Sequence, residues 1–242
     1  MKVKTTLKLK IRALIKVIGV MLILSACSAY SNAPSPSYIS GGPLTERLKN
    51  YGLKPGDEVL IRIFKEEAML EVWMKPKGKK EFIHFSNYPI CNYSGTLGPK
   101  IYEGDYQAPE GFYRVDRKAL NPHSRFYKSF NLGFPNSFDR ALGRTGSYLM
   151  VHGKCDSVGC YAMTDPQIEE IYGLVELALK NGQPYVEVQA YPFKMDKSRL
   201  NREKQSLHYE FWDNLQEGYQ QFERSRRPLD YRVSGGRYLF KG

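Results

Sequence analysis

Three classes of protein leave signatures that this sequence lacks. No apolar run reaches the roughly 20 residues that a membrane-spanning helix needs, and no basic patch with interleaved aromatic residues favours nucleic acid. The chain has 4 cysteines and 4 histidines, and their spacing is not that of a known zinc ribbon. His84, His123 and His208 have no partner nearby in the sequence. We therefore expect that the protein binds no nucleic acid, no metal and no cofactor. Any reaction it catalyses would then depend on its own side chains.

Residues 1–26 are typical of the signal peptide of an exported lipoprotein. Six cations without any acidic residue precede a short apolar run, Val17–Leu24. These cations are Lys2, Lys4, Lys8, Lys10, Arg12 and Lys16. The sequence Leu24-Ser25-Ala26-Cys27 is similar to a bacterial lipobox, in which Cys27 receives a lipid after cleavage before it. We predict an exported, periplasmic protein that is anchored through this lipid to a membrane, and Ser28 favours the outer membrane. The alternative is an ordinary signal peptide cut after Ala29, which would discard Cys27.

The net charge has a simple distribution. The whole chain carries a formal charge of +11, and the six cations of the signal supply much of it. The remaining positive charge is modest. It suits attraction to a carboxylate-rich wall polymer, and it equally suits an ordinary solvated surface.

Residues 27–57 are predicted to form a tether and a short helix. Ser, Pro and Gly dominate residues 31–43, and a helix over 44–51 ends before Gly52. Alternating apolar residues then predict an antiparallel meander of three strands, at 59–64, 70–74 and 82–89. Such a meander is typical of the first sheet of a β-sandwich-like fold.

A long segment, residues 121–144, is rich in Asn, Gly, Pro, Ser and aromatic residues. We interpret it as an irregular flap over a substrate groove, because long loops in compact domains are usually functional. Arg125, Tyr127 and Arg144 would then bind carboxylates. The alternative is that these residues are surface charges and core aromatics.

The C-terminal third is predicted to be helical with two β segments. Asp165 as N-cap and Pro166 in the first turn begin a helix that ends at Asn181-Gly182. A strand over 184–192 follows, then one amphipathic helix over 196–226 and a hairpin over 231–240.

The stretch 148–165 carries the most distinctive chemistry. A short apolar strand, Tyr148–Val151, ends at His152, and a tight polar loop leads to Cys160. A neutral histidine can take the proton of a thiol, and the resulting thiolate is a nucleophile. Gly159 leaves room for a substrate carbonyl and lets a backbone N–H point into the site. These residues suit a cysteine enzyme of acyl transfer.

His152-Gly153 followed by Ser157-x-Gly159-Cys160 resembles the active-site signature of the L,D-transpeptidase catalytic domain, a bacterial cell-wall family. With Cys155 in the loop and Ala162-Met163 after it, the pattern is similar to the YafK-like subgroup of murein hydrolases. An Arg that cross-linking members carry two residues after the cysteine is absent. The resemblance implies an α+β, β-rich sandwich over residues 58–193, with a helix after the catalytic loop, and a C-terminal helical extension and hairpin over 194–242.

The resemblance also implies a covalent mechanism on peptidoglycan stem peptides. Cys160 would attack an amide carbonyl at diaminopimelate, and the N–H groups of Gly159 and Cys160 would stabilise the oxyanion. Ser157 and Gly153 would support the loop, and a backbone carbonyl would orient His152. Hydrolysis of the thioester would, for example, release murein-bound outer-membrane lipoprotein. The alternatives are a transpeptidase that forms cross-links or attaches lipoprotein, and a non-catalytic peptidoglycan-binding lipoprotein.

The remaining cysteines leave three arrangements open. With Cys27 lipidated and Cys160 free, Cys91 and Cys155 could form a disulfide, which export would preserve. A Cys155–Cys160 bridge would instead silence the thiol until it is reduced. The third arrangement is zinc bound by His152, Cys155, Cys160 and Cys91.

Overall fold

The computed structural model describes residues 42–241. The predicted signal peptide, the predicted lipidation site at Cys27 and nearly all of the predicted Ser- and Pro-rich tether lie outside the described residues. Within residues 42–241, no helix is long and apolar enough to cross a membrane.

The first sheet contains the predicted meander and two later strands. β1 (Glu58–Phe64) pairs antiparallel with β2 (Met69–Lys75), which pairs antiparallel with β3 (Ile83–Pro89). On its other edge β1 pairs in parallel with β10 (Val186–Tyr191), and β5 (Gly111–Val115) closes the sheet. The strand order is β3-β2-β1-β10-β5.

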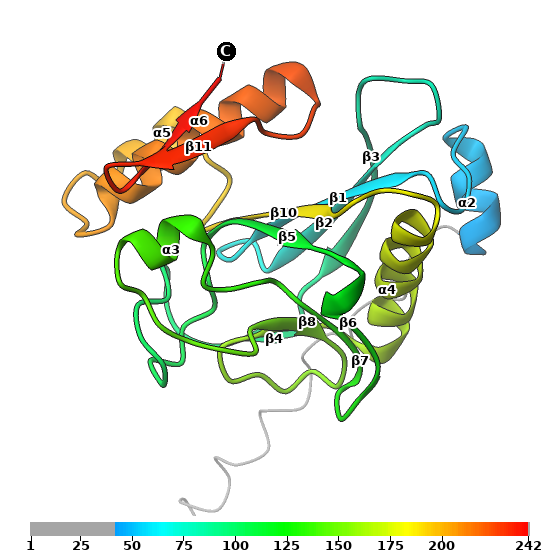
Figure 1. Cartoon of the computed structure of the whole chain (residues 1–242), viewed down its shortest axis with the longest axis horizontal. Coiled ribbons are helices and arrows are strands. Elements are labelled where there is room, and N and C mark those ends of the chain that lie inside the picture. Colours follow the sequence, from blue (N-terminus) through cyan, green and yellow to red (C-terminus); the bar gives the residue numbers. More distant parts are fainter. Residues whose placement is uncertain (1–41, 242) are drawn as a thin grey trace, which may run out of the picture. The chain divides into compact units, whose positions relative to one another are not determined.

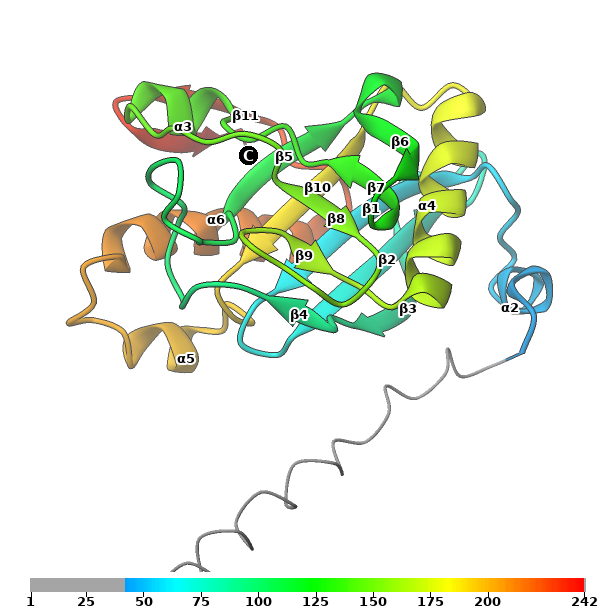
Figure 2. The same ribbon diagram turned by 90° about the horizontal axis from the view of Figure 1, so that it is seen from below.

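The second sheet is shorter and holds the stretch with the distinctive chemistry. Its order is β4-β9-β8-β7-β6. The strands are β4 (Asn92–Tyr93), β9 (Tyr161–Ala162), β8 (Met150–His152), β7 (Tyr127–Asn131) and β6 (Leu120–Ser124). A 3-10 turn, η1 (Arg117–Ala119), precedes β6. In Figure 2, β9, β8 and β7 lie in front of β1, β2 and β10 of the first sheet.

Both faces of the first sheet are buried, each against a different partner. Val59, Ile61 and Ile63 face one core, which they share with the second sheet and with α4 (Asp165–Lys180). Leu60 and Phe64 face the opposite core, which the C-terminal residues cover. Side chains alternate along a strand, so one apolar strand can serve both cores.

The C-terminal residues cover the second face of this sheet. They form α5 (Lys197–Asn201), α6 (Tyr209–Ser225) and a hairpin of β11 (Tyr231–Ser234) and β12 (Arg237–Phe240). Figure 1 shows α6 and β11 on one side of the sheet, and β4, β8 and α4 on the other side. The remaining helices are α2 (Leu44–Asn50) and α3 (Ser137–Ala141). The predicted α+β, β-rich architecture is confirmed.

Three local predictions were wrong. Residues 121–144 are not an irregular flap, because β6 and β7 form a hairpin that pairs with β8. The predicted single helix over 196–226 is broken between α5 and α6. Helix α4 begins one residue earlier than predicted: Thr164, and not Asp165, is its N-cap, and the Gln167 side chain accepts from the Thr164 backbone N–H at 3.0 Å.

The flap residues bind other protein groups rather than lining a groove. Arg144 is buried and its Nη1 donates to Oδ1 of Asp139 at 2.9 Å. The hydroxyl of Tyr127 donates to Glu169 at 2.7 Å. Arg125 is exposed. Tyr127 and Arg144 therefore fit the alternative interpretation better, in which the residues of this segment do not bind the carboxylates of a ligand.

Candidate active site

The parallel pairing of β8 with β9 brings Cys160 beside the strand that carries His152. Val151 lies opposite Tyr161 and His152 lies opposite Ala162. Cys160 directly precedes β9, and its sulfur lies against the start of β8. Its Sγ accepts from the Met150 backbone N–H at 3.4 Å and donates to the Tyr148 carbonyl at 3.6 Å.

The imidazole of His152 is held in one tautomer. Its Nδ1 lies 2.7 Å from the Gly153 carbonyl oxygen. A carbonyl can only accept, so Nδ1 carries the proton and Nε2 keeps a free lone pair. The Phe126 ring packs against the imidazole with 4.5 Å between ring centroids, and His152 is 1% exposed. Burial lowers the pKa of His152, so the imidazole is a neutral base near pH 7.

Cys160 is the free cysteine of residues 42–241, and it is half-buried. Burial raises the pKa of its thiol, while the hydrogen bond from Met150 and the charge of Lys100 act in the opposite direction. The net direction is upward. With these shifts, the Cys160 thiol keeps its proton near pH 7, and the imidazole of His152 is neutral at the same pH.

Within the described residues, no hydrogen bond joins Sγ of Cys160 to the imidazole. The thiol hydrogen is instead directed to the Tyr148 carbonyl. Catalytic hydrogen bonds are often loose before substrate binds.

Hydroxyl groups occupy both N–H donors that the sequence assigned to the oxyanion. Ser157 Oγ accepts from the Cys160 N–H at 3.1 Å and donates to the Cys160 carbonyl at 2.7 Å. The Gly159 N–H donates to Ser94 Oγ in a short contact. A substrate oxygen must therefore displace these hydroxyls to use the two N–H groups. Both hydrogen bonds of Ser157 Oγ close the turn between Ser157 and Cys160.

The two glycines of the site are needed for different reasons. Gly159 has φ +89°, a left-handed conformation that side chains disfavour. Gly153 has no such torsion, but a Cβ there would lie 2.6 Å from Asp165 Oδ1 and 2.9 Å from the Phe126 carbonyl. The same Asp165 oxygen accepts from the Lys154 N–H at 2.9 Å. The start of α4 thus packs directly on the loop that positions His152.

A disulfide joins Cys91 to Cys155, with 5.1 Å between their Cα atoms. It ties the residue before β4 to the loop between His152 and Cys160. In this structure Cys155 is therefore not bridged to Cys160. The zinc arrangement is not assembled either, since two of its four ligands are in the disulfide and no group of three His, Cys, Asp or Glu within residues 42–241 could hold a metal.

Sequence reasoning missed Ser94 and Lys100. Ser94 lies 65 residues from Gly159 in the chain, and no local pattern connects them. Lys100 is buried, and its ammonium donates to Asp105 at 2.6 Å and to the Tyr102 carbonyl at 2.9 Å.

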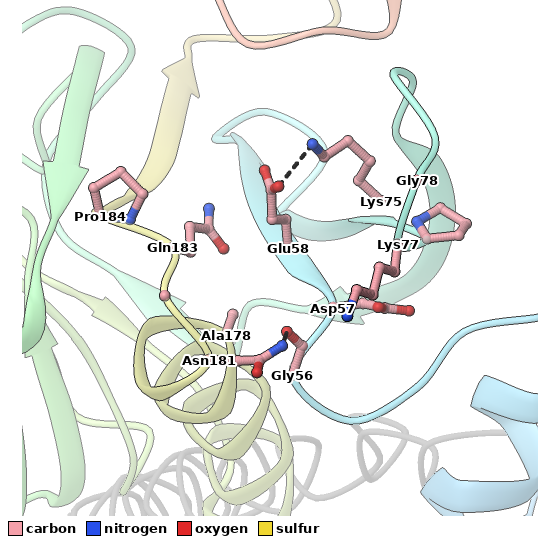
Figure 3. Close-up of a pocket in the computed structure, with 12 residues that line it drawn as sticks. Gly56, Asp57, Glu58, Lys75, Lys77, Gly78, Ala178, Asn181, Gln183 and Pro184 are labelled. Carbon is pink, nitrogen blue, oxygen red and sulfur yellow. Dashed lines mark hydrogen bonds and ion pairs between the residues drawn. The ribbon is translucent and has the colours of Figure 1, made fainter.

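A cavity of about 340 Å³ lies away from this pair of residues. Figure 3 shows it between the start of β1, the end of β2 and the end of α4, with Lys75 paired to Glu58. Asn181 and Gln183 directly follow the C-terminal end of α4, whereas the loop of His152 and Cys160 precedes its N-terminal end. None of the lining residues belongs to the loop of His152 and Cys160.

Known proteins similar to this chain agree on the family. Residues 58–189 match the family model described as the L,D-transpeptidase catalytic domain. A protein of Escherichia coli strain K12, named YafK and provisionally assigned as an L,D-transpeptidase, is 48% identical over 184 residues. That match covers 76% of this chain and 74% of the relative.

Solved structures show weaker similarity. Pgp2 of Campylobacter jejuni, described as a helical cell shape determining protein, is 19% identical with a TM-score of 0.44, covering 77% of this chain and 79% of that one. Bd1075 of Bdellovibrio bacteriovorus is 20% identical with a TM-score of 0.40, covering 70% and 56% respectively.

Proposed function

We propose, from the premise that the chain belongs to the L,D-transpeptidase catalytic-domain family, that it is a cysteine hydrolase of peptidoglycan. The bond cut is an amide at the diaminopimelate of a stem peptide, as in the release of murein-bound lipoprotein. One observation carries the proposal: a free, half-buried thiol lies against the strand that presents His152 as a neutral base. The family supplies the peptidoglycan substrate.

The reaction proceeds through a thioester on Cys160. Sγ forms a bond to the amide carbonyl carbon while Nε2 of His152 takes the thiol proton. The C–N bond then breaks, and the imidazolium returns the proton to the departing amine. Water next attacks the thioester, gives a proton to His152, and the C–S bond breaks to restore the thiol. Donors at Gly159 and Cys160, freed from their serine partners, stabilise the oxyanion of both steps.

The residues after Cys160 favour water over a second peptide as the acceptor. Ala162 and Met163 are both fully buried and uncharged, where cross-linking members carry an Arg. A planar guanidinium is suited to hold the carboxylate of an incoming peptide strand. Without this cation, an acceptor peptide is bound less well, and water is the more effective acceptor.

Product masses from purified sacculi distinguish hydrolysis from cross-linking and from simple binding. We expect wild-type protein to release products one water heavier than the intact bond, with no new cross-links. Cys160→Ala abolishes this release, and His152→Gln lowers it by about 10²–10⁴-fold. His123→Gln, at an exposed histidine outside the site, is the matched control. If the Cys160→Ala variant still released these products, both the hydrolase and the transpeptidase hypotheses would be refuted.

We also propose that the protein is exported and anchored by a lipid on Cys27, facing the wall from the outer membrane. Support comes from the sequence alone, in the cationic start and the Leu24-Ser25-Ala26-Cys27 pattern. Labelled palmitate should be incorporated into the wild type and not into Cys27→Ala. Equal labelling of the two, or none in either, would contradict the anchor.

A further inference from the structure

Exposed apolar side chains gather on the loops around Cys160. Within residues 42–241, ten large apolar side chains are exposed, and five of them lie on these loops. They are Ile101, Tyr102, Tyr106, Tyr148 and Val158. Most other rings of the chain are packed in the two cores. An apolar surface that gathers beside a reactive group indicates a place where a partner binds.

Three tyrosine rings dominate this surface. Tyr102 is 61% exposed, Tyr106 is 64% exposed and Tyr148 is 74% exposed. Within the described part of the chain, none of these rings stacks on another ring or on a cation, and none of their hydroxyls makes a hydrogen bond. Each therefore offers an apolar face and a polar hydroxyl to a ligand.

Hydrogen bonds join the two loops that carry these rings. The Thr145 N–H donates to the Ile101 carbonyl at 3.0 Å, and the Glu103 N–H donates to Thr145 Oγ1 at 3.1 Å. Ser147 Oγ donates to Glu103 at 3.2 Å. The loop of Tyr102 and Tyr106 and the loop of Tyr148 thus form one connected surface.

The same surface is connected to the reactive group. The Tyr148 carbonyl accepts from Sγ of Cys160 at 3.6 Å. The Tyr106 carbonyl accepts from Ser94 Oγ at 2.7 Å, and that hydroxyl in turn accepts from the Gly159 N–H. The rings of Tyr106 and Tyr148 therefore belong to segments that contact Gly159 and Cys160.

Two of the tyrosines adopt a backbone conformation that is unfavourable for a bulky residue. Tyr106 has φ +56° and Tyr148 has φ +54°, both in the left-handed region. Since their rings are exposed, packing of the side chain does not offset this strain. Strained residues cluster at functional sites, where the surrounding structure holds them for a purpose.

We propose that Tyr102, Tyr106 and Tyr148 form a binding platform for the glycan strand of peptidoglycan. Apolar faces of sugar rings pack on the phenol rings, and sugar hydroxyls bond to the tyrosine hydroxyls. A lipid tail would bury those hydroxyls without partners, which is costly. The platform holds the polymer while its stem peptide lies across Cys160. This inference rests on the proposed function, which supplies peptidoglycan as the substrate. It adds that the glycan strand is bound at a distance from the scissile bond.

Binding to sacculi tests the platform without any reaction. Two proteins are compared: the Cys160→Ala variant, and the same variant that also carries Tyr106→Asn and Tyr148→Asn. Their affinities are measured by co-sedimentation with sacculi from which attached protein has been removed. Asparagine removes the ring yet tolerates the left-handed backbone. The double variant is expected to bind at least tenfold more weakly, while Tyr106→Phe with Tyr148→Phe retains more of the affinity. Tyr51→Asn removes a ring that is 50% exposed at the end of α2 and should have no effect.

Several outcomes would overturn the platform. The platform would be refuted if the Asn double variant kept its full affinity for sacculi at an unchanged melting temperature. It would also be refuted if Tyr51→Asn lost as much affinity as the double variant. Binding only to sacculi that still carry attached lipoprotein would indicate a protein partner and would also refute the glycan. Because binding is measured without the thiol, failure of wild-type hydrolysis would refute the proposed function and leave this result standing.

Discussion

Burial moves the pKa values of His152 and Cys160 in opposite directions, so both side chains are neutral in the folded protein near pH 7. The imidazole loses its proton more readily than usual, and the thiol keeps its proton more firmly. Such a pair has little reactivity toward stray electrophiles. In the proposed mechanism, the nucleophile forms only when the substrate arrives.

Alkylation of Cys160 measures this directly. Because the pKa of the thiol is raised above its ordinary value, the rate of reaction with iodoacetamide should climb about tenfold per pH unit from pH 7 and still be rising at pH 9. Mass spectrometry of the folded protein, with its disulfide intact, gives the rate. A plateau below pH 8 would show a thiolate that is already formed, and a thiol that never reacts would show a sealed site.

The sequence predicted some single residues of the site and could not predict others. The candidates His152, Ser157, Gly159 and Cys160 lie within one short stretch, so their spacing can be read directly from the sequence. Ser94 reaches Gly159 through the pairing of β4 with β9, and such contacts depend on the tertiary fold. Gly159 and Cys160 were predicted to supply the oxyanion donors, and the sequence gives no sign of the hydroxyls that occupy these N–H groups.

Among the elements, β4, β9 and the catalytic loop are joined by the disulfide of Cys91 and Cys155. The strand pairs involved are only two residues long, and short pairs are weak on their own. The covalent link restrains the loop at Cys155, midway between His152 and Cys160.

Loss of this disulfide should be costly. A link between cysteines 64 residues apart is worth up to about 4 kcal/mol through loop closure in the unfolded chain. We expect urea unfolding of Cys91→Ser with Cys155→Ser to show a loss of this order. Added reductant should have no effect on the double variant but should destabilise the wild type. Equal stability of the two proteins would contradict the link.

A buried ion pair joins another set of elements. Nζ of Lys65, at the end of β1, lies 3.0 Å from Glu110 Oε1, and both side chains are fully buried. Glu110 also accepts from Trp212 Nε1 of α6 at 2.8 Å and from the Gly98 N–H at 2.8 Å. The pair thus connects the first sheet, the loop before β5 and the C-terminal helix.

Removing the carboxylate charge should destabilise the protein strongly. Glu110→Gln leaves the Lys65 ammonium buried without its counter-ion, a change that typically costs about 3–5 kcal/mol. Glu58→Gln is the matched control, since the pair of Glu58 with Lys75 is partly exposed and is worth under about 1 kcal/mol. Chemical unfolding of both variants gives the comparison. A loss in Glu110→Gln no larger than in the control would refute this role.

Helices and strands were predicted correctly where apolar residues recur with a clear period. The prediction failed where a strand forms only because it pairs with another strand. The meander at residues 59–89 alternates clearly, and α4 has its terminal signals in sequence. Residues 121–131 contain Pro122 and several polar residues, and their strands form because β7 pairs with β8. The break between α5 and α6 is a turn, in which Ser206 Oγ accepts from the His208 N–H at 3.2 Å, and the sequence around it remains compatible with a helix.

In the described molecule as a whole, residues 194–241 complete a core and do not form a separate appendage. Trp212, Leu215 and Phe222 pack on Leu60 and Phe64 of the first sheet. Further links are polar: Glu187 of β10 is buried and accepts from the Leu229 N–H. Burial raises the pKa of Glu187 to about 7, against opposing hydrogen bonds from Gln189 and Leu229.

This raised pKa makes stability depend on pH. Below about pH 4.5, the ordinary value, Glu187 is protonated in both the folded and the unfolded chain. Between there and about pH 7 the folded state alone retains the proton, so stability falls as pH rises, by about 3 kcal/mol in total. Glu187→Gln cannot titrate. We expect the unfolding free energy of wild type minus that of Glu187→Gln to decrease by this order between pH 4.5 and 7, and a constant difference would contradict it.

The most direct measurement of the central claim is the mass of the Cys160 acyl-enzyme. Wild-type protein is mixed with purified stem-peptide substrate, quenched in acid within the first turnover, digested and analysed by mass spectrometry. The account predicts that the peptide containing Cys160 gains the mass of the acyl portion of the substrate, that hydroxylamine removes it, and that Cys160→Ala acquires none. Product release with no adduct on Cys160 at any quench time, or an adduct on another residue, would contradict it.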